Sequence, residues 1–538
     1  MHIRSLTAIA LALGLLAACD KQEDAQPYAV EEVPLSRVAD DLAAGATSSV
    51  MVTQAYIDRI GLYNGAVNGV IAIMPDALEQ AAASDQRRKD GKTLGPLDGI
   101  PILIKDNIDA LGLPTTAGSF ALIDNVPLKD SEVARRLREA GAVILGKANT
   151  SQWAGLRTTA GGLNGSTVGG PAHNPYDLAR GAAGSSNGSG ISAAASFAAA
   201  TVGTDTTGSV VAPSNANGVV GLRPTVALIS RRGIVPVSLT QDTAGPMGRN
   251  VRDVAMLLTV LAGTDAADPA TAASDTHKTD YANALSIEAL QGKRIGVYRG
   301  TNAFERTQAQ FEEALSVLQA QGATLVDIPD AVLEDLSQEQ RLIMIYDIKE
   351  DMAAYLAQAP ANVKHRTLAD LIAFNKADPR ENTYGQDLFE AAEATTGRGT
   401  PAYIETREYA QRRAGAEGYG KAMSDYEISA IVAPTGGPAG LIGGGAPAPG
   451  AAPPAGGGHP AAVTPKGARK PSISGVAALA GYPNLSVPMG YVDGMPVGLS
   501  FVGPPWSEDQ LLAMGYAYEQ ASKKRVPPSA YKQGASSN

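Results

Sequence analysis

Two short turns rich in glycine and serine enclose an alanine-rich segment between residues 183 and 209. The first turn is Ala183-Gly184-Ser185-Ser186-Asn187-Gly188-Ser189, and the second is Gly203-Thr204-Asp205-Thr206-Thr207-Gly208-Ser209. Because both turns lack bulky side chains, their backbone N–H groups can approach a bound ligand closely. A serine framed by such amides is a candidate nucleophile that faces an oxyanion hole. The small residues of Gly190 to Ala200, between the turns, predict a tightly packed helix.

A third segment upstream supplies a possible base. The apolar run Ile100 to Ile104 predicts a buried strand, and Lys105 follows at its end. Taken alone, a glycine-serine turn is usually an ordinary loop, and a lysine at a strand end usually reaches solvent. The functional interpretation therefore depends on the three segments together.

Together these segments resemble the amidase signature family. The similarity continues through Asn217 to Thr225 and Asp242 to Pro246, and it spans roughly Val38 to Pro527. The resemblance implies a Ser–cis-Ser–Lys triad. In this triad Ser209 is the nucleophile, Ser185 is the serine that follows a cis peptide bond with Gly184, and Lys105 is the base.

The resemblance also implies how the triad works. Neutral Lys105 accepts a proton from Ser185, which accepts one from Ser209, so that Ser209 can attack an amide carbonyl and form an acyl-enzyme. Since the ordinary pKa of lysine is about 10.4, burial must lower it for this role. The backbone N–H groups of Thr206, Thr207, Gly208 and Ser209 are the predicted oxyanion donors. Gly184 and Val211 are predicted to border the substrate pocket.

The sequence departs from the commoner family pattern at several positions. Ala183, Asn187 and Thr207 stand where many members have glycine, which allows more backbone freedom. Val211 stands where many relatives, including amidotransferase A subunits, carry arginine. The loss of that cation argues against a small substrate that bears a carboxylate.

Several segments resemble the bacterial peptide amidase branch, whose members release ammonia from C-terminally amidated peptides. They include Leu368 to Asn375, Phe389 to Ala416, Ser230 to Pro236 and Tyr516 to Gln520. We therefore expect a serine amidase that acts on peptide amides. The alternatives are an aryl or aliphatic acylamidase, an amidotransferase A-type subunit, and a catalytically silent lipoprotein that binds peptides, because related folds process different amides.

Two other motifs predict different enzymes. Gly184 to Gly188 matches G-x-S-x-G, which would make Ser186 the nucleophile of an α/β-hydrolase. That mechanism needs a histidine, and His277, His365 and His459 lie in polar or loop-like contexts. Ser529 to Lys532 matches S-x-x-K, but it lies in the C-terminal tail without an accompanying K-T-G. No H-E-x-x-H motif occurs in the sequence, and we predict no metal and no cofactor.

The charge balance and the cysteine count limit the classes of partner and cross-link that the chain can have. A net charge of −10 and a pI near 5.2 argue against nucleic acid. The single cysteine, Cys19, excludes an internal disulfide. We expect a small-molecule or peptide amide as the substrate.

The N-terminus resembles a bacterial lipoprotein leader. Residues 1–18 contain Arg4 followed by an apolar stretch that is short for a membrane span, which is typical of a signal peptide. Leu16-Ala17-Ala18-Cys19 looks like a lipobox, which implies that Cys19 is lipidated. Asp20 resembles the residue that retains such proteins at the inner membrane, and polar residues 19–34 suit a tether. We expect a periplasmic protein attached to the membrane only through this lipid.

The remaining chain predicts an α/β fold: one large domain over residues 35–530, with a large mixed β-sheet covered by helices on both faces. Thr53 is expected to cap an early helix, and Asp493-Gly494 to form a hairpin turn. Residues 333–416 are expected to form a helical insertion that could roof the pocket. Residues 436–471, rich in glycine, proline and alanine, are either a flap over the substrate entrance or a solvated insertion.

Overall fold

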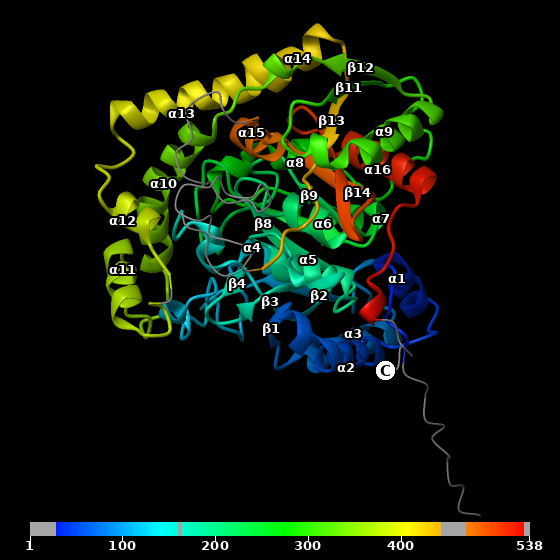
Figure 1. Ribbon diagram of the computed structural model, residues 1–538. Coiled ribbons are helices and arrows are strands. Elements are labelled where there is room, and N and C mark those ends of the chain that lie inside the picture. Colours follow the sequence, from blue (N-terminus) through cyan, green and yellow to red (C-terminus); the bar gives the residue numbers. More distant parts are fainter. Residues whose placement is uncertain (1–27, 160–163, 383, 443–469, 532–538) are drawn as a thin grey trace, which may run out of the picture.

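The protein is built on one mixed sheet of 11 strands (Figure 1). The structure, a computed structural model, describes residues 28–159, 164–382, 384–442 and 470–531. In spatial order the strands are β1 (Val70–Ile73), β3 (Val143–Ala148), β2 (Pro101–Lys105), β8 (Ala200–Asp205), β10 (Thr243–Gly248), β9 (Val220–Arg223), β14 (Asn484–Val492), β15 (Met495–Val502), β13 (Ala430–Pro434), β11 (Arg294–Tyr298) and β12 (Thr324–Ile328).

The sheet combines parallel and antiparallel pairs. Strand β2 runs parallel to β3 and β8, and β11 runs parallel to β12 and β13, whereas the other neighbours are antiparallel. Short strands form two small separate ladders: β4 (Gly165–Ser166) with β5 (Gly170–Pro171), and β6 (His173–Asn174) with β7 (Asp177–Gly181). The prediction of a large mixed sheet is confirmed.

Helices cover both faces of the sheet. They are α1 (Leu35–Ala43), α2 (Ser49–Val67), α3 (Ala77–Lys89), α4 (Glu132–Glu139), α5 (Asn187–Ala194), α6 (Val211–Asn217), α7 (Val251–Leu261), α8 (Ser274–His277), α9 (Phe304–Ala320), α10 (Ser337–Ala357), α11 (Leu368–Ala377), α12 (Asp387–Glu393), α13 (Pro401–Ala414), α14 (Gly420–Asp425), α15 (Ile473–Ala480) and α16 (Glu508–Ser522). The apolar faces of α1 to α4, α7, α9 and α16 pack with the buried strands in the main hydrophobic core, whereas α10 to α15 contribute to two further hydrophobic clusters.

Two helices differ from the prediction. Helix α2 begins at Ser49, and the Ser48 side chain caps it by accepting a hydrogen bond from the Met51 N–H, so Thr53 lies inside the helix and is not its cap. The helix between the two glycine-serine turns is α5, which is shorter than the predicted range 190–200. It ends because Ser196 adopts a positive φ of 57°, and the chain then enters β8 at Ala200.

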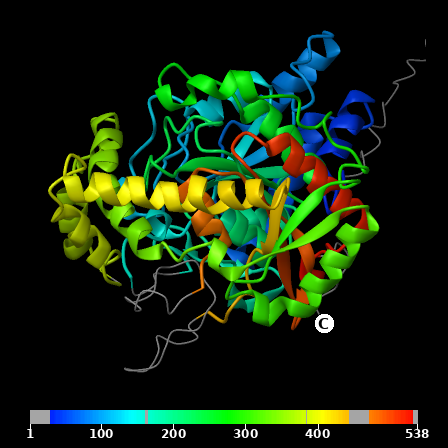
Figure 2. The same cartoon turned by 90° about the horizontal axis from the view of Figure 1, so that it is seen from above.

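Helices α10 to α13 occupy residues 337–414, within the segment predicted to be helical. Figures 1 and 2 show α11 and α12 grouped at one side of the molecule, and α10 packs against α11, α12 and α13. The Asp493-Gly494 turn joins β14 to β15, and both of its residues have positive φ, as a tight hairpin requires.

Several predicted features lie outside the described residues. These are the signal peptide of residues 1–18, the lipidation site Cys19, residues 19–27 of the tether and residues 443–469 of the loop rich in glycine, proline and alanine. Within the described part of the chain, no helix is both long and apolar enough to cross a bilayer.

Candidate active site

Lys105 is the last residue of β2 and is fully buried. Its Nζ lies 2.8 Å from the Ser185 Oγ and 2.8 Å from the Thr204 Oγ1. The parallel pairing of β2 with β8 explains the second contact, because parallel strands bring their carboxyl ends to the same edge of a sheet. Lys105 therefore meets hydroxyl groups, and no ion pair of its amine with a carboxylate is found within the described residues.

Ser185 follows a cis peptide bond with Gly184, as predicted. Its carbonyl oxygen accepts hydrogen bonds from the Ser151 N–H (3.0 Å) and the Thr150 hydroxyl (3.2 Å), which fix the turn to the loop after β3. The preceding Ala183 has a φ of 55°, a conformation that glycine adopts more readily. This explains physically why glycine suits position 183.

Ser186, the alternative nucleophile, has a structural role here. Its hydroxyl donates to the Thr204 carbonyl oxygen (2.9 Å) and accepts from the Thr204 N–H (3.1 Å), and the residue is fully buried. His277 stacks on Trp506 and His365 packs on Phe374, while His459 lies outside the described residues. Among the described residues, no histidine makes the serine–histidine contact that an α/β-hydrolase needs.

Ser209 ends the turn that leaves β8. Asp205 shapes this turn by accepting hydrogen bonds from the N–H groups of Gly208 and Val210, both at 2.7 Å. Arg223 on β9 pairs with Asp205 at 2.7 Å, and both side chains are fully buried. The N–H of Gly208, one of the four predicted oxyanion donors, is thus engaged by Asp205 inside the protein. The N–H groups of the other three, Thr206, Thr207 and Ser209, remain candidate donors to a substrate.

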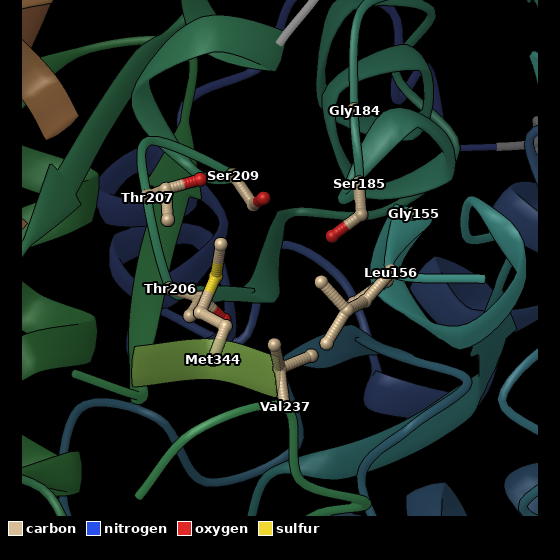
Figure 3. Close-up of a pocket in the computed structure, with 10 residues that line it drawn as sticks. Gly155, Leu156, Gly184, Ser185, Thr206, Thr207, Ser209, Val237 and Met344 are labelled. Atoms are coloured by element: carbon tan, nitrogen blue, oxygen red, sulfur yellow. The ribbon is translucent and has the colours of Figure 1, made fainter. Parts of the chain in front are cut away.

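Both serines line one pocket of about 450 Å³, part of which is open to solvent. Figure 3 shows the hydroxyls of Ser185 and Ser209 pointing into the same space, with Met344 and Val237 also facing it. The ten lining residues are Ala154, Gly155, Leu156, Gly184, Ser185, Thr206, Thr207, Ser209, Val237 and Met344. Val211 is buried at the start of α6 and is not one of them.

Burial sets the charge state of the lysine. It lowers the pKa of Lys105 to about 7, and the negative charges of Asp205 and Asp242 act in the opposite direction. Asp242 is itself buried, which raises the pKa of its carboxyl to about 6. A large fraction of Lys105 is therefore a neutral amine near pH 7, which is the state that can accept a proton.

Some side chains that hold the site together were not predicted from the sequence. Asp242 accepts hydrogen bonds from the Thr206 hydroxyl (2.6 Å) and from the N–H groups of Val237 (2.8 Å) and Ser238 (2.9 Å). Asp205 and Arg223 fix the turn of Ser209. Asp205, Arg223 and Asp242 all lie inside the stretches that carry the family resemblance, and this position is what in the sequence could have indicated their importance. Their roles emerge only when distant strands are placed side by side.

The described residues contain no group of three or more histidine, cysteine, aspartate or glutamate side chains that could hold a metal ion. The site as built offers hydroxyls, backbone amides and one buried amine. These are the groups that acyl transfer requires.

Comparison with known proteins agrees with this chemistry. The family described as amidase matches residues 51–512. A peptide amidase from Stenotrophomonas maltophilia is 41% identical, with a TM-score of 0.84, over 92% of this chain and 98% of that chain. A probable amidase of Arabidopsis thaliana is 32% identical over 93% of this chain and 92% of its own length.

A component of an amidotransferase is also similar. The A-type subunit of the glutamyl-tRNA(Gln) amidotransferase of Chloroflexus aurantiacus is 33% identical over 90% of this chain and 95% of its own length. The matches extend over nearly the whole chain in every case. This chain therefore belongs to the amidase signature family and is a hydrolase of amide C–N bonds.

Proposed function

We propose that the chain is a serine amidase that releases ammonia from C-terminal peptide amides through an acyl-enzyme at Ser209. The observation that carries the proposal is the contact of the Lys105 Nζ with the Ser185 Oγ at 2.8 Å, beside the pocket that Ser185 and Ser209 share. A buried amine whose pKa is lowered to about 7 is suited to act as the base of this relay.

In the proposed reaction, every proton that the relay takes up is later returned. The Ser209 oxygen attacks the amide carbonyl carbon while its proton passes to Ser185, whose own proton passes to Lys105. Backbone N–H groups of Thr206, Thr207 and Ser209 stabilise the oxyanion. The relay then returns a proton to the nitrogen, the C–N bond breaks and ammonia leaves. Water attacks the acyl-enzyme by the same path, which frees the carboxylic acid and restores Ser209.

The similarity to a peptide amidase supports the choice of peptide amides. An amidotransferase component is the second candidate, because relatives with that name are 33% identical. The apolar Val211 and the export signal expected in residues 1–18 favour the amidase. An aryl acylamidase would act through the same site, and a silent peptide-binding protein would not need a neutral buried lysine.

The experiment compares substrates on the purified chain. We expect ammonia release from dipeptide amides, with little release from glutamine and slower cleavage of a simple aryl anilide. A fluorophosphonate should label Ser209, and Ser209→Ala should lose both labelling and turnover while it keeps the circular dichroism of the parent. Ser186→Ala is the matched control, because among the described residues the Ser186 hydroxyl bonds only to Thr204, and this variant should still be labelled. Turnover by Ser209→Ala would reject the proposal.

The cellular location is part of the same proposal. Lipidation of Cys19 would attach the enzyme to the periplasmic side of the inner membrane, where it would meet exported or imported peptides. Fractionation of cells that express the full chain tests this, since Cys19→Ala should move the activity from the membrane to the soluble fraction.

A further inference from the structure

The side of the pocket away from the serine hydroxyls is apolar. Leu156, Val237 and Met344 face the cavity, and none of its ten lining residues carries a charge. The three side chains come from distant parts of the sequence: a loop after β3, the segment before β10, and helix α10. Figure 3 shows them on one side of the space, with Ser185 and Ser209 on the other.

These side chains are the edge of a larger hydrophobic cluster. Leu156, Val237 and Met344 belong to a buried cluster that also contains Trp153, Val235, Ile348, Met352, Leu371 and Phe389. The cluster fills the space between helices α10 to α12 and the loops beside the sheet. An apolar group that enters the pocket therefore continues an existing hydrophobic contact surface and leaves water.

Leu156, Val237 and Met344 form an apolar wall of the pocket, and the carboxylates behind this wall already have hydrogen-bond partners. Asp242 accepts hydrogen bonds from Thr206, Val237 and Ser238, and Asp347 accepts them from the hydroxyls of Ser238 and Tyr403, both at 2.6 Å. Since neither carboxylate lines the pocket, a charged substrate side chain would lose its water without gaining an ionic partner.

The leaving group does not need this wall. Hydrolysis of a primary carboxamide releases ammonia, which is too small to reach three apolar side chains at once. The wall must therefore face the acyl part of the substrate, and the nearest variable group there is the side chain of the residue that carries the amide.

We propose that Leu156, Val237 and Met344 form a specificity subsite for an uncharged, apolar C-terminal residue of the peptide amide, and that Met344 sets its depth. This inference rests on the proposed function. It adds the substrate class: amidated peptides that end in residues such as leucine or methionine. Met344 is suited to this position because its unbranched side chain adapts to differently shaped partners.

The test measures kcat/KM for ammonia release from N-acetylated glycyl-Xaa amides in which Xaa is leucine, methionine, alanine, aspartate or lysine. We expect the leucine amide to exceed the alanine amide by about 10-fold or more, because each methylene in such a pocket contributes roughly 10-fold or more. The aspartate and lysine amides should be the poorest substrates. Met344→Ala should lower kcat/KM for the leucine amide by about 10-fold while it changes the alanine amide by less than about threefold.

Ile348→Ala is the matched control. Ile348 lies one turn further along α10, is buried in the same cluster and does not line the pocket. The variant should lose stability but keep the leucine-to-alanine ratio. An equal change of this ratio in both variants, or a flat wild-type profile across the five amides, would overturn the inference while the proposed function stands. Failure of the proposed function looks different: no amide is hydrolysed and Ser209 is not labelled.

Discussion

Two fully buried lysines lie on adjacent parallel strands, and their surroundings give them different roles. Lys105 is the last residue of β2, and Lys147 lies on β3, where it pairs with Ile104 of β2. The Lys105 amine meets the hydroxyls of Ser185 and Thr204. The Lys147 amine instead donates to the Ile108 carbonyl oxygen (2.5 Å) and the Thr115 hydroxyl (2.8 Å), with the Asp106 carboxylate 3.9 Å away.

The difference is one of charge compensation. Burial lowers the pKa of both lysines, and nearby carboxylates partly offset this lowering. For Lys147 these carboxylates are Asp106, Asp109 and Asp130. For Lys105 they are Asp205 and Asp242, which hydrogen-bond to other groups. Only the Lys105 amine is joined to a serine that lines the pocket. A buried lysine can thus become a base or a structural cation depending on whether hydroxyls or a carboxylate lie beside it.

The largest expected effect comes from removing the amine of Lys105. Lys105→Met keeps the volume and deletes the base, so we expect kcat/KM to fall by about 1000-fold or more, within the range of general-base removal. The free energy of unfolding should change by about 1 kcal/mol, because the lost hydrogen bonds are to hydroxyl groups. Ammonia release and urea denaturation measure the two effects. Activity within 10-fold of the parent would remove Lys105 from the mechanism.

Lys147→Met is expected to reverse this pattern. It leaves the buried Asp106 without its cation, and breaking a buried pair in this way costs about 3 kcal/mol. We expect the urea midpoint to fall accordingly, while kcat/KM of the folded enzyme decreases by less than about 10-fold, since Lys147 is not part of the relay. If Lys147→Met instead lost activity as completely as Lys105→Met without losing stability, the distinction between the two lysines would be wrong.

The sequence indicated Lys105 but not Lys147, although both follow apolar runs. Lys147 lies inside β3, and none of the motifs that carry the family resemblance includes it. The large sheet could be predicted because strands such as β2, β13 and β15 are apolar segments between turns. Likewise the Gly184–Ser185 turn could be predicted, because its glycine-serine composition and its resemblance point to the same place.

Other features depend on contacts between segments far apart in the chain. Ser185 and Ser186 are neighbours of the same type, and only the position of Thr204 shows which hydroxyl is used inside the fold. The engagement of the Gly208 N–H by Asp205 arises from the shape of one turn. Met344 reaches the pocket from helix α10, whose sequence gives no sign of a substrate contact. Periodicity predicts that such residues are buried, but not what they face.

Substitution of Asp242 tests the difference between the two lysines by a small change of charge, because the charge of Asp242 acts on Lys105 but not on Lys147. The active form of Lys105 is the neutral amine, so kcat/KM should rise with pH through about 7. The negative charge of Asp242 favours the protonated amine. Asp242→Asn should therefore lower the pKa of Lys105 and move the rise to lower pH. When each profile is divided by its own maximum, the two should converge below pH 6, where the carboxyl of Asp242, with its pKa of about 6, becomes neutral in the parent.

The same variant should also reduce the rate, and a second carboxylate separates the two effects. Asparagine cannot accept all three hydrogen bonds that hold Thr206, Val237 and Ser238, so we expect kcat/KM at its optimum to fall by about 10-fold, less than the roughly 100-fold cost of deleting an oxyanion donor. Asp351 is the control: burial raises the pKa of its carboxyl to about 6 too, but it binds the Leu239 N–H and Arg398. Asp351→Asn should leave the pH at half-maximal kcat/KM unchanged. A rise displaced to higher pH in Asp242→Asn, or displaced equally in both variants, would show that the lysine does not respond to this charge.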